Sequence, residues 1–385
     1  MRWRSIQKCL IFISVKAKMI QSGKMNIAIY TSAHGYGHAS RSYEIARTLI
    51  EKRSDIAVYF NSWVPDSFFS GEENPRIIRR KKRFDVGIRQ IDSLTMDLPG
   101  TLQDLEDLRM NSNQLIKEEV EFFREAGIEL ALADLPHLIF EAAEKAGIPA
   151  WGLSNFSWDW IYEEYVNAYP GLQSHIDLIR RSYQRAEGVF RLPFSGGMGY
   201  FKMVIDVPLL ARRSKLGKTE SRKRLEIGLD DPVILFSFGG FKLSIPADIT
   251  PCDDLILLSS DPSPDPGAPF SHITDEALKK LDLRYCDLVA AADAVVSKLG
   301  YGIVSECMAN QTSLIYTSRG QFREYPILRR AVNQYLPSAE IKLEDLKKGR
   351  WLDAFTSLLN RDFPPKPDCS GAETIADKLI EKANL

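Results

Sequence analysis

A glycine-rich stretch late in the chain has the residue types that phosphate binding requires. Lys298 is followed by two glycines, Gly300 and Gly302, which separate an apolar run from a helical pattern. Glycine lets the backbone turn tightly, and the first helical turn offers unpaired N–H groups with partial positive charge. Lysine adds a full charge, so a diphosphate could bind here, while Glu306 could accept sugar or ribose hydroxyls. The alternative is a strand–turn–helix junction without a ligand, because short glycine patterns also arise by chance.

Two histidines lie in a second glycine-rich loop, near the start of the chain. His34 and His38 follow an apolar run at residues 27–31, and Asp134 ends another such run at residues 130–134. Histidine exchanges protons near neutral pH, so either ring is a candidate general base. Open α/β sheets bind ligands at the carboxyl ends of their strands, where all three side chains are expected. A solvated loop or helix-cap position is the alternative for each histidine.

The order of the elements around these loops predicts an α/β fold. A strand at residues 27–31, a helix from about 40 to 53 and a strand at 56–60 form a βαβ unit. Residues 232–240 repeat the opening plan, because an apolar strand again runs into two glycines. A second parallel sheet is therefore expected in the second half of the chain.

Length, charge and cysteine content limit the possible classes of protein. A chain of 385 residues exceeds the usual size of one core, which predicts two domains. The formal net charge of -1 gives no reason to expect nucleic acid or an anionic membrane as a partner. The five cysteines are scattered without metal-ligand spacing, which favours a reduced, cytoplasmic setting. No transmembrane segment is evident from the sequence.

We predict four segments along the chain. Residues 1–24 are expected to be an extension outside the fold, because the first complete strand begins at Met25. An N-terminal domain at 25–205, a linker at 206–224 and a C-terminal domain at 225–385 follow. The sequence leaves open whether the final amphipathic helix packs back on the N-terminal domain.

Several short motifs, taken in order, resemble the GT-B glycosyltransferases. They lie at residues 34–38, 134–136, 154–160, 207–213, 237–241, 298–306 and 322–326. Within that superfamily the set is similar to the stand-alone glycosyltransferase-like proteins related to the N-terminal domain of plant L-arabinokinase. The resemblance covers about residues 25–330 and implies two Rossmann-like domains that face each other across a cleft. One departure lies at residues 311–313, where Gln-Thr-Ser replaces the Gly-x-Pro of the family pattern.

The resemblance implies a metal-independent, inverting glycosyltransferase that moves a sugar from a nucleoside diphosphate to an acceptor hydroxyl. The implied base is His38, with His34 as the second choice, and Asp134 would orient or assist it. The nucleotide-sugar-binding residues would be Gly239, Gly240, Lys298, Gly300, Tyr301, Gly302, Ser305, Glu306 and Glu324. The acceptor side would include Gly35, Gly37, Asn155 and Trp158. The expected partners are a nucleotide-sugar donor and an acceptor, and neither a cofactor nor a metal is expected.

Two other functions fit the same sequence. A binding module could retain the cleft and lose turnover, and the departure at residues 311–313 favours this alternative slightly. A non-hydrolysing nucleotide-sugar epimerase would share the two-domain plan. It would also need a further cluster of acid and base carboxylates, which the sequence does not show.

Overall fold

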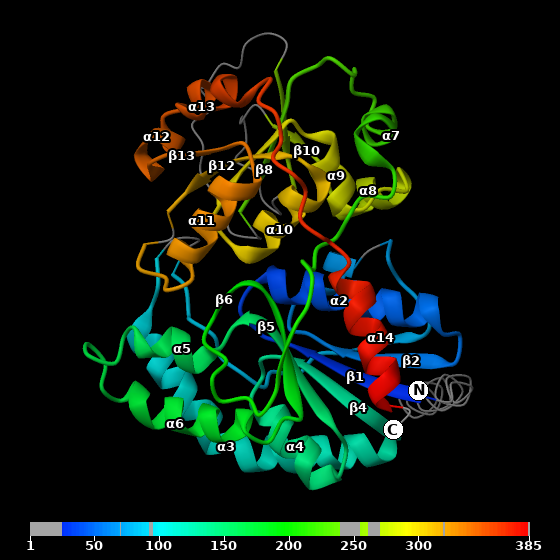
Figure 1. Cartoon of the computed structure of the whole chain (residues 1–385), viewed down its shortest axis with the longest axis vertical. Coiled ribbons are helices and arrows are strands. Elements are labelled where there is room, and N and C mark those ends of the chain that lie inside the picture. Colours follow the sequence, from blue (N-terminus) through cyan, green and yellow to red (C-terminus); the bar gives the residue numbers. More distant parts are fainter. Residues whose placement is uncertain are drawn as a thin grey trace, which may run out of the picture.

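Two parallel β-sheets, one in each half of the chain, form the framework of the protein (Figure 1). The computed structural model describes residues 25–69, 71–91, 95–238, 255–260, 270–318 and 320–383. Helices cover both sheets, so the prediction of an α/β fold with two Rossmann-like halves is confirmed. The extension predicted at residues 1–24 lies outside the described residues.

In the described part of the chain, the first sheet has seven parallel strands in the order β3-β2-β1-β4-β5-β6-β7. The strands are β1 (Met25–Thr31), β2 (Ile56–Asn61), β3 (Ile77–Arg80), β4 (Ile128–Asp134), β5 (Ala150–Phe156), β6 (Gly188–Gly196) and β7 (Val204–Asp206). The strand order reverses direction between β1 and β4, which pair in a register that places Thr31 beside Asp134. Such a switch point opens a crevice at the carboxyl ends of the strands, where ligands of α/β proteins bind.

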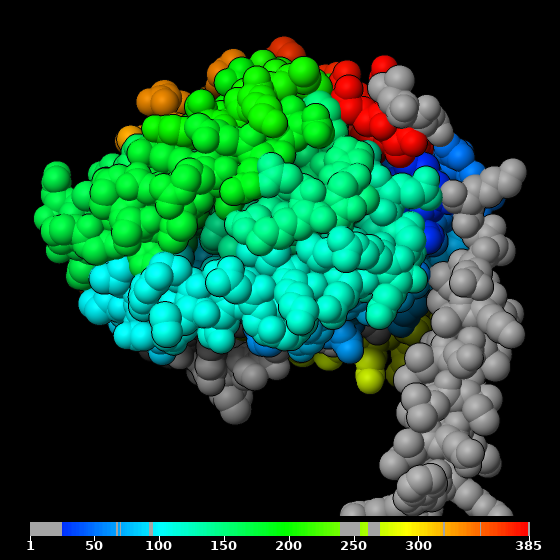
Figure 2. Space-filling model, turned by 90° about the horizontal axis from the view of Figure 1, so that it is seen from below, coloured from blue at the N-terminus to red at the C-terminus, as the bar shows by residue number. Residues whose placement is uncertain are grey.

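Helices pack on both faces of this sheet. They are α2 (Tyr36–Lys52), the short 3-10 helix η1 (Asp66–Phe69), α3 (Leu98–Glu125), α4 (Leu138–Ala146), α5 (Trp158–Glu163) and α6 (Leu172–Tyr183). Seen from below, α3, α4 and α6 form much of the outer surface of this half (Figure 2). Helix α2 lies on the opposite face, toward the second half.

Helix α2 begins at Tyr36, four residues before its predicted start. Gly35 precedes it with φ 74 and ψ 178, a backbone conformation that glycine adopts without strain. Gly37 and His38 therefore lie in the first helical turn and not in a loop.

Within the residues that the structure describes, the second sheet has six strands in the order β10-β9-β8-β11-β12-β13. They are β8 (Val233–Ser237), β9 (Ile256–Ser259), β10 (Ser271–His272), β11 (Ala294–Lys298), β12 (Ser313–Thr317) and β13 (Ser338–Glu340). The helices of this half are α7 (Gly217–Arg224), α8 (Asp275–Lys280), α9 (Tyr285–Ala291), α10 (Tyr301–Asn310), α11 (Tyr325–Tyr335), α12 (Leu343–Lys347) and α13 (Trp351–Leu358). Helix α7 packs against α9, so the segment predicted as a linker contains a helix that contacts the second half.

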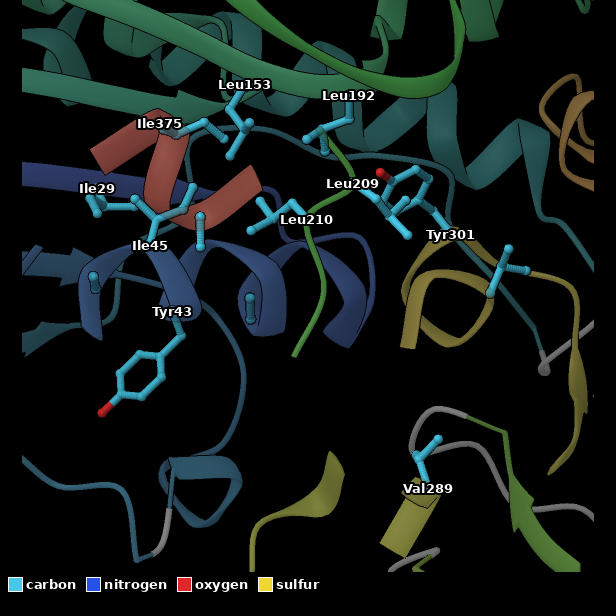
Figure 3. Close-up of a cluster of buried hydrophobic side chains, with 14 of the residues drawn as sticks. Ile29, Tyr43, Ile45, Leu153, Leu192, Leu209, Leu210, Val289, Tyr301 and Ile375 are labelled. Atoms are coloured by element: carbon cyan, nitrogen blue, oxygen red, sulfur yellow. The ribbon is translucent and has the colours of Figure 1, made fainter. Parts of the chain in front are cut away.

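The last helix, α14 (Gly371–Ala383), returns to the first half and packs beside α2 (Figure 1). Lys52 on α2 and Asp377 on α14 form an ion pair at 2.7 Å. Figure 3 shows Ile375 of α14 directed into the same apolar cluster as Ile29 and Ile45. This cluster continues through the connecting segment after β7 into the second half, so one core joins both halves.

Polar contacts also join the halves on two sides. On one side, Arg284 of the second half binds Glu44 at 2.6 Å and Glu72 at 3.2 Å. On the other, Arg323 pairs with Glu163 of α5 at 2.8 Å. The two halves are thus held together one above the other (Figure 1), and residues at the carboxyl ends of strands from both sheets line the cavity between them.

Candidate active site

Each half contributes a Gly-Tyr-Gly sequence, at residues 35–37 and 300–302, to the start of a helix. The second glycines of the two sequences meet between the halves. A Cβ atom added to Gly302 would lie 3.2 Å from the Cα of Gly37, closer than ordinary van der Waals contact. The N-termini of α2 and α10 therefore meet at the same cleft, and each brings unpaired N–H groups and partial positive charge.

A cavity of about 280 Å³ lies at this meeting point and is lined by both halves. Its lining includes the predicted residues His34, Gly35, Gly37, His38, Asn155, Lys298, Gly300, Tyr301, Gly302, Glu306 and Glu324. Asp134, Trp158 and Ser305 lie behind the lining and are at most 2% exposed. Gly239 and Gly240 lie outside the described residues. The structure thus brings most of the predicted residues together, while their roles stay predictions.

His38 and Asp134 form a hydrogen-bonded pair at the wall of the cavity. The Nδ1 atom of His38 lies 2.9 Å from Oδ1 of Asp134, and both side chains are buried. No group in the described residues bonds the Nε2 atom of His38. A ring whose Nδ1–H is held by a carboxylate has an Nε2 lone pair that can accept a proton.

His34 is less suited to act as a base. Its Nδ1 atom accepts a hydrogen bond from the backbone N–H of Ile88 at 3.3 Å. In the neutral ring the proton then sits on Nε2, which can donate but not accept. The ring stacks on Phe322 of the second half and meets Trp158 edge-on. His34 therefore contributes to the apolar wall between the halves.

Trp158, predicted for the acceptor side, supports this wall from behind. Its Nε1–H donates to the buried carboxylate of Asp85 at 3.2 Å, and the same carboxylate accepts from the N–H of Ala33 at 2.9 Å. Burial raises the pKa of Asp85. Asp85 therefore ties the His34 loop to Trp158, and sequence reasoning missed it.

Arg41 is the central charge of the site, and the sequence prediction did not include it. It binds Asp134 through Nε at 2.6 Å and through Nη2 at 2.7 Å. It also donates to Ser154 at 3.0 Å and to Asn155 at 2.8 Å. Burial alone would raise the pKa of Asp134, but Arg41 and His38 lower it to about 2. Asp134 is therefore a carboxylate throughout the physiological pH range.

Glu306, predicted to take ribose hydroxyls, is already paired. One carboxylate oxygen lies 2.6 Å from Nε of Arg212, which follows β7 in the connection between the halves. Burial raises the pKa of Glu306, and Arg212 opposes this effect. Any ligand hydroxyl at Glu306 must share the carboxylate with this arginine. Arg212 was not predicted, although it lies in the motif at residues 207–213.

The other predicted residues of the second half have different surroundings. Lys298 at the end of β11 and Gly300 before α10 line the cavity. Ser305 donates back to the carbonyl of Gly302 at 2.9 Å, a bond within its own helix. Glu324 accepts a hydrogen bond from Asn155 of the first half at 2.6 Å. Lys298 and Glu324 thus remain the candidate charged groups for a donor.

The described residues form neither a cluster of metal ligands nor a membrane-spanning helix. Those residues contain no group of three or more His, Cys, Asp or Glu side chains arranged to hold a metal ion. No helix within them is both long and apolar enough to cross a bilayer.

Comparisons with known proteins bear on the fold. No family model matches the chain. The chain is 32% identical over 373 residues to L-arabinokinase of Arabidopsis thaliana, covering 92% of this chain and 34% of that protein. It therefore spans about a third of the length of this relative. The resemblance to L-arabinokinase expected from the sequence is confirmed.

Solved structures place the two sheets in a known architecture. The glycotransferase of kitacinnamycin matches with a TM-score of 0.56 at 15% identity, over 93% of this chain and 98% of its own. The calicheamicin glycosyltransferase CalG4 matches with a TM-score of 0.56 at 14% identity, over 94% and 95%. This chain has the GT-B fold. UGT89C1 of Arabidopsis thaliana, solved with UDP, matches this GT-B chain with a TM-score of 0.58 at 12% identity, over 94% and 100%.

Proposed function

We propose that the protein is a glycosyltransferase that moves a sugar from a nucleoside-diphosphate donor to an acceptor hydroxyl. The observation that carries the proposal is the pair of His38 and Asp134 at the wall of a cavity between two GT-B halves. The pairing leaves an imidazole nitrogen unbonded within the described residues, at the place where an acceptor would enter. UDP complexes of proteins with the same fold support a nucleotide as the donor group.

The proposed reaction is a single displacement. The acceptor O–H gives its proton to Nε2 of His38, and its oxygen forms a bond to the anomeric carbon of the donor sugar. The bond from that carbon to the diphosphate oxygen breaks, and the nucleoside diphosphate leaves with the electron pair. Asp134 stabilises the imidazolium that forms, as a carboxylate does for other catalytic histidines. Attack from the side opposite the leaving group inverts the anomeric centre.

Charge on the leaving diphosphate would be stabilised from both halves. Lys298 supplies a full positive charge, and the first turns of α2 and α10 supply N–H groups. Because these groups can carry the developing charge, the proposed mechanism needs no metal ion. Glu324 and Asn155, which bond each other, are proposed to contact the donor sugar.

The test measures transfer with defined donors. The purified chain is incubated with UDP-, GDP- and dTDP-sugars and a panel of hydroxyl acceptors, and release of nucleoside diphosphate is followed by ³¹P NMR. We expect His38→Ala to lower turnover by roughly 10²–10⁴-fold, the usual contribution of a general base. His175→Ala, which removes another buried histidine on α6, serves as the matched control and should retain turnover.

The same experiment separates the other functions. Saturable nucleotide binding without release of diphosphate would contradict transfer and support a binding module. Interconversion of the donor sugar without an acceptor would support an epimerase.

A further inference from the structure

Arg41 is a buried cation that donates hydrogen bonds to three residues of the site, Asp134, Ser154 and Asn155. It lies one helical turn after His38 on α2 and is 4% exposed. Its Nε and Nη2 atoms form a fork on both oxygens of Asp134, and Nη1 bonds Asn155. Four of its five N–H hydrogens thus have acceptors within the protein, although the residue also lines the cavity. Most of its hydrogen bonding therefore acts on the other residues of the site.

The hydrogens of Arg41 determine which nitrogen of His38 carries a proton. Nη2 has two hydrogens, and these have acceptors in Asp134 at 2.7 Å and Ser154 at 3.0 Å. Nδ1 of His38 lies 2.9 Å from the same Nη2 atom, so Nη2 has three partners for two hydrogens. When these hydrogens go to Asp134 and Ser154, Nδ1 carries its own hydrogen and donates it to Oδ1 of Asp134. This tautomer leaves Nε2 as the acceptor.

The charge of Arg41 has a second effect on the same ring. A buried carboxylate with no other cation nearby would draw a proton onto His38 and so form an ion pair. Because the positive charge of Arg41 already neutralises the charge of Asp134, His38 can remain neutral while its Nδ1–H is hydrogen-bonded to that carboxylate.

Other charged or titratable groups also face this region from neighbouring elements. They are Asp85 from the segment after β3, Tyr301 of α10, and Glu324 next to Asn155. Tyr301 lies under the Arg41 guanidinium, with the Cζ atom 5.2 Å from the ring centroid. Among the described residues, however, the charged groups at hydrogen-bond distance from the His38 ring are Asp134 and Arg41.

The network also reaches the second half of the protein. The amide oxygen of Asn155 accepts from Arg41, so its Nδ2 must face the other way, where it donates to Glu324 at 2.6 Å. Glu324, which is predicted to contact the donor, is therefore four hydrogen bonds from His38, through Asn155, Arg41 and Asp134. If a donor sugar displaced Glu324 from Asn155, the hydrogen bond between Asn155 and Arg41 would also be affected.

We propose that Arg41 is a positioning residue that fixes the Nδ1–H tautomer of His38 and keeps its ring neutral, by neutralising Asp134. The proposal rests on the assignment of His38 as the base of the transfer reaction. It adds a requirement that a His–Asp pair alone would not meet, namely a third group that keeps the carboxylate from charging the histidine.

The test reads the protonation of His38 directly and needs no substrate. Protein labelled with ¹⁵N at histidine is examined by long-range ¹H–¹⁵N NMR at pH 7.5, and the His38 signal is assigned by its loss in His38→Gln. In the wild type we expect a protonated Nδ1 and an unprotonated Nε2. In Arg41→Met we expect a rise of roughly tenfold or more in the ratio of charged to neutral ring, because a nearby charge shifts such equilibria by one to three powers of ten.

Two further variants complete the test. Arg41→Lys keeps a buried positive charge and should stay close to the wild type, while Arg47→Met removes an arginine of the same helix and should change nothing. A Lys variant that matches the Met variant would overturn the proposal, as would a Met variant that matches the wild type.

If Arg41→Met does not fold, the spectrum of the wild-type protein alone still tests the proposal. A wild-type ring protonated at Nε2 and not at Nδ1 would overturn both this proposal and the role of His38 as base. The expected tautomer together with an absence of sugar transfer would contradict the proposed function and leave the role of Arg41 supported.

Discussion

The ion pair of Arg212 and Glu306 allows a sharp test of how the cavity wall is built. Their Nε and Oε1 atoms are 2.6 Å apart, and the side chains are 9% and 4% exposed. The guanidinium also lies over the ring of Tyr285, 4.8 Å from its centroid. The variants are Glu306→Gln, Arg212→Met and the double variant. Each single change removes one charge and leaves the other buried.

The expected loss in free energy of unfolding follows from the burial of the ion pair. Removing one member of a buried ion pair costs about 3–5 kcal/mol, because the remaining charge has no compensation. Since both residues line a cavity, water can reach the remaining charge, and we expect about 3 kcal/mol for each single variant. The double variant leaves no unpaired charge. It should therefore lose much less than the sum of the two single losses, with a coupling of about 2 kcal/mol or more.

The assay is urea unfolding of the four proteins, followed by calorimetric titration with UDP. If Glu306 also accepts ribose hydroxyls, the double variant should bind UDP more weakly by about 1.5–3 kcal/mol, the usual range for hydrogen bonds to a charged group. That loss would appear in a protein whose fold is largely restored. Single variants within about 1 kcal/mol of the wild type would refute the reasoning on the pair. An unchanged UDP affinity in the double variant would refute a role of Glu306 in ribose binding.

Two further predictions concern stability alone. Burial first, and the charge of His175 second, lower the pKa of His137 to about 4, so the unfolded chain takes up this proton at higher pH than the folded one. The contribution of neutral His137 to the free energy of unfolding is then fully present above about pH 6.5 and is lost as the pH falls toward 4. His137→Gln should therefore lose about 3 kcal/mol less of this free energy than the wild type over the same range. Equal pH profiles in urea unfolding would contradict this. Gln311 ends α10 in a left-handed conformation with φ 54, so Gln311→Gly should stabilise the protein by roughly 0.5–1 kcal/mol, and a lower melting temperature would contradict it.

The strands and their loops could be predicted because their signals are local. The apolar run that precedes Gly300 forms β11 (Ala294–Lys298), and the strand expected at 27–31 is the end of β1 (Met25–Thr31). In parallel sheets such strands are short apolar runs that end in glycine or polar residues, and no distant information is needed to find them. The placement of Asp134 beside the histidine loop followed from the same rule, because strand ends converge.

Partners of buried charges could not be predicted in this way. Arg212 and Glu306 are 94 residues apart, and nothing near either position indicates the other. From the sequence alone, Glu306 was therefore predicted to be available to a ligand, whereas the structure shows it paired with Arg212. The departure at residue 311 has a local explanation, because Gln311 ends α10 in the left-handed conformation that glycine commonly adopts after a helix.

The start of α2 explains why Arg41 was overlooked. With a helix beginning at residue 40, His38 belongs to a loop and has no fixed relation to Arg41. With the true start at Tyr36, the two residues are three positions apart on one helix and share a face. Any carboxylate that reaches His38 from β4 must then also lie within reach of Arg41, as Asp134 does. Gly37 is compatible with this first turn, because the N–H groups there have no helical partner. An error of four residues in one helix boundary thus concealed the main electrostatic feature of the site.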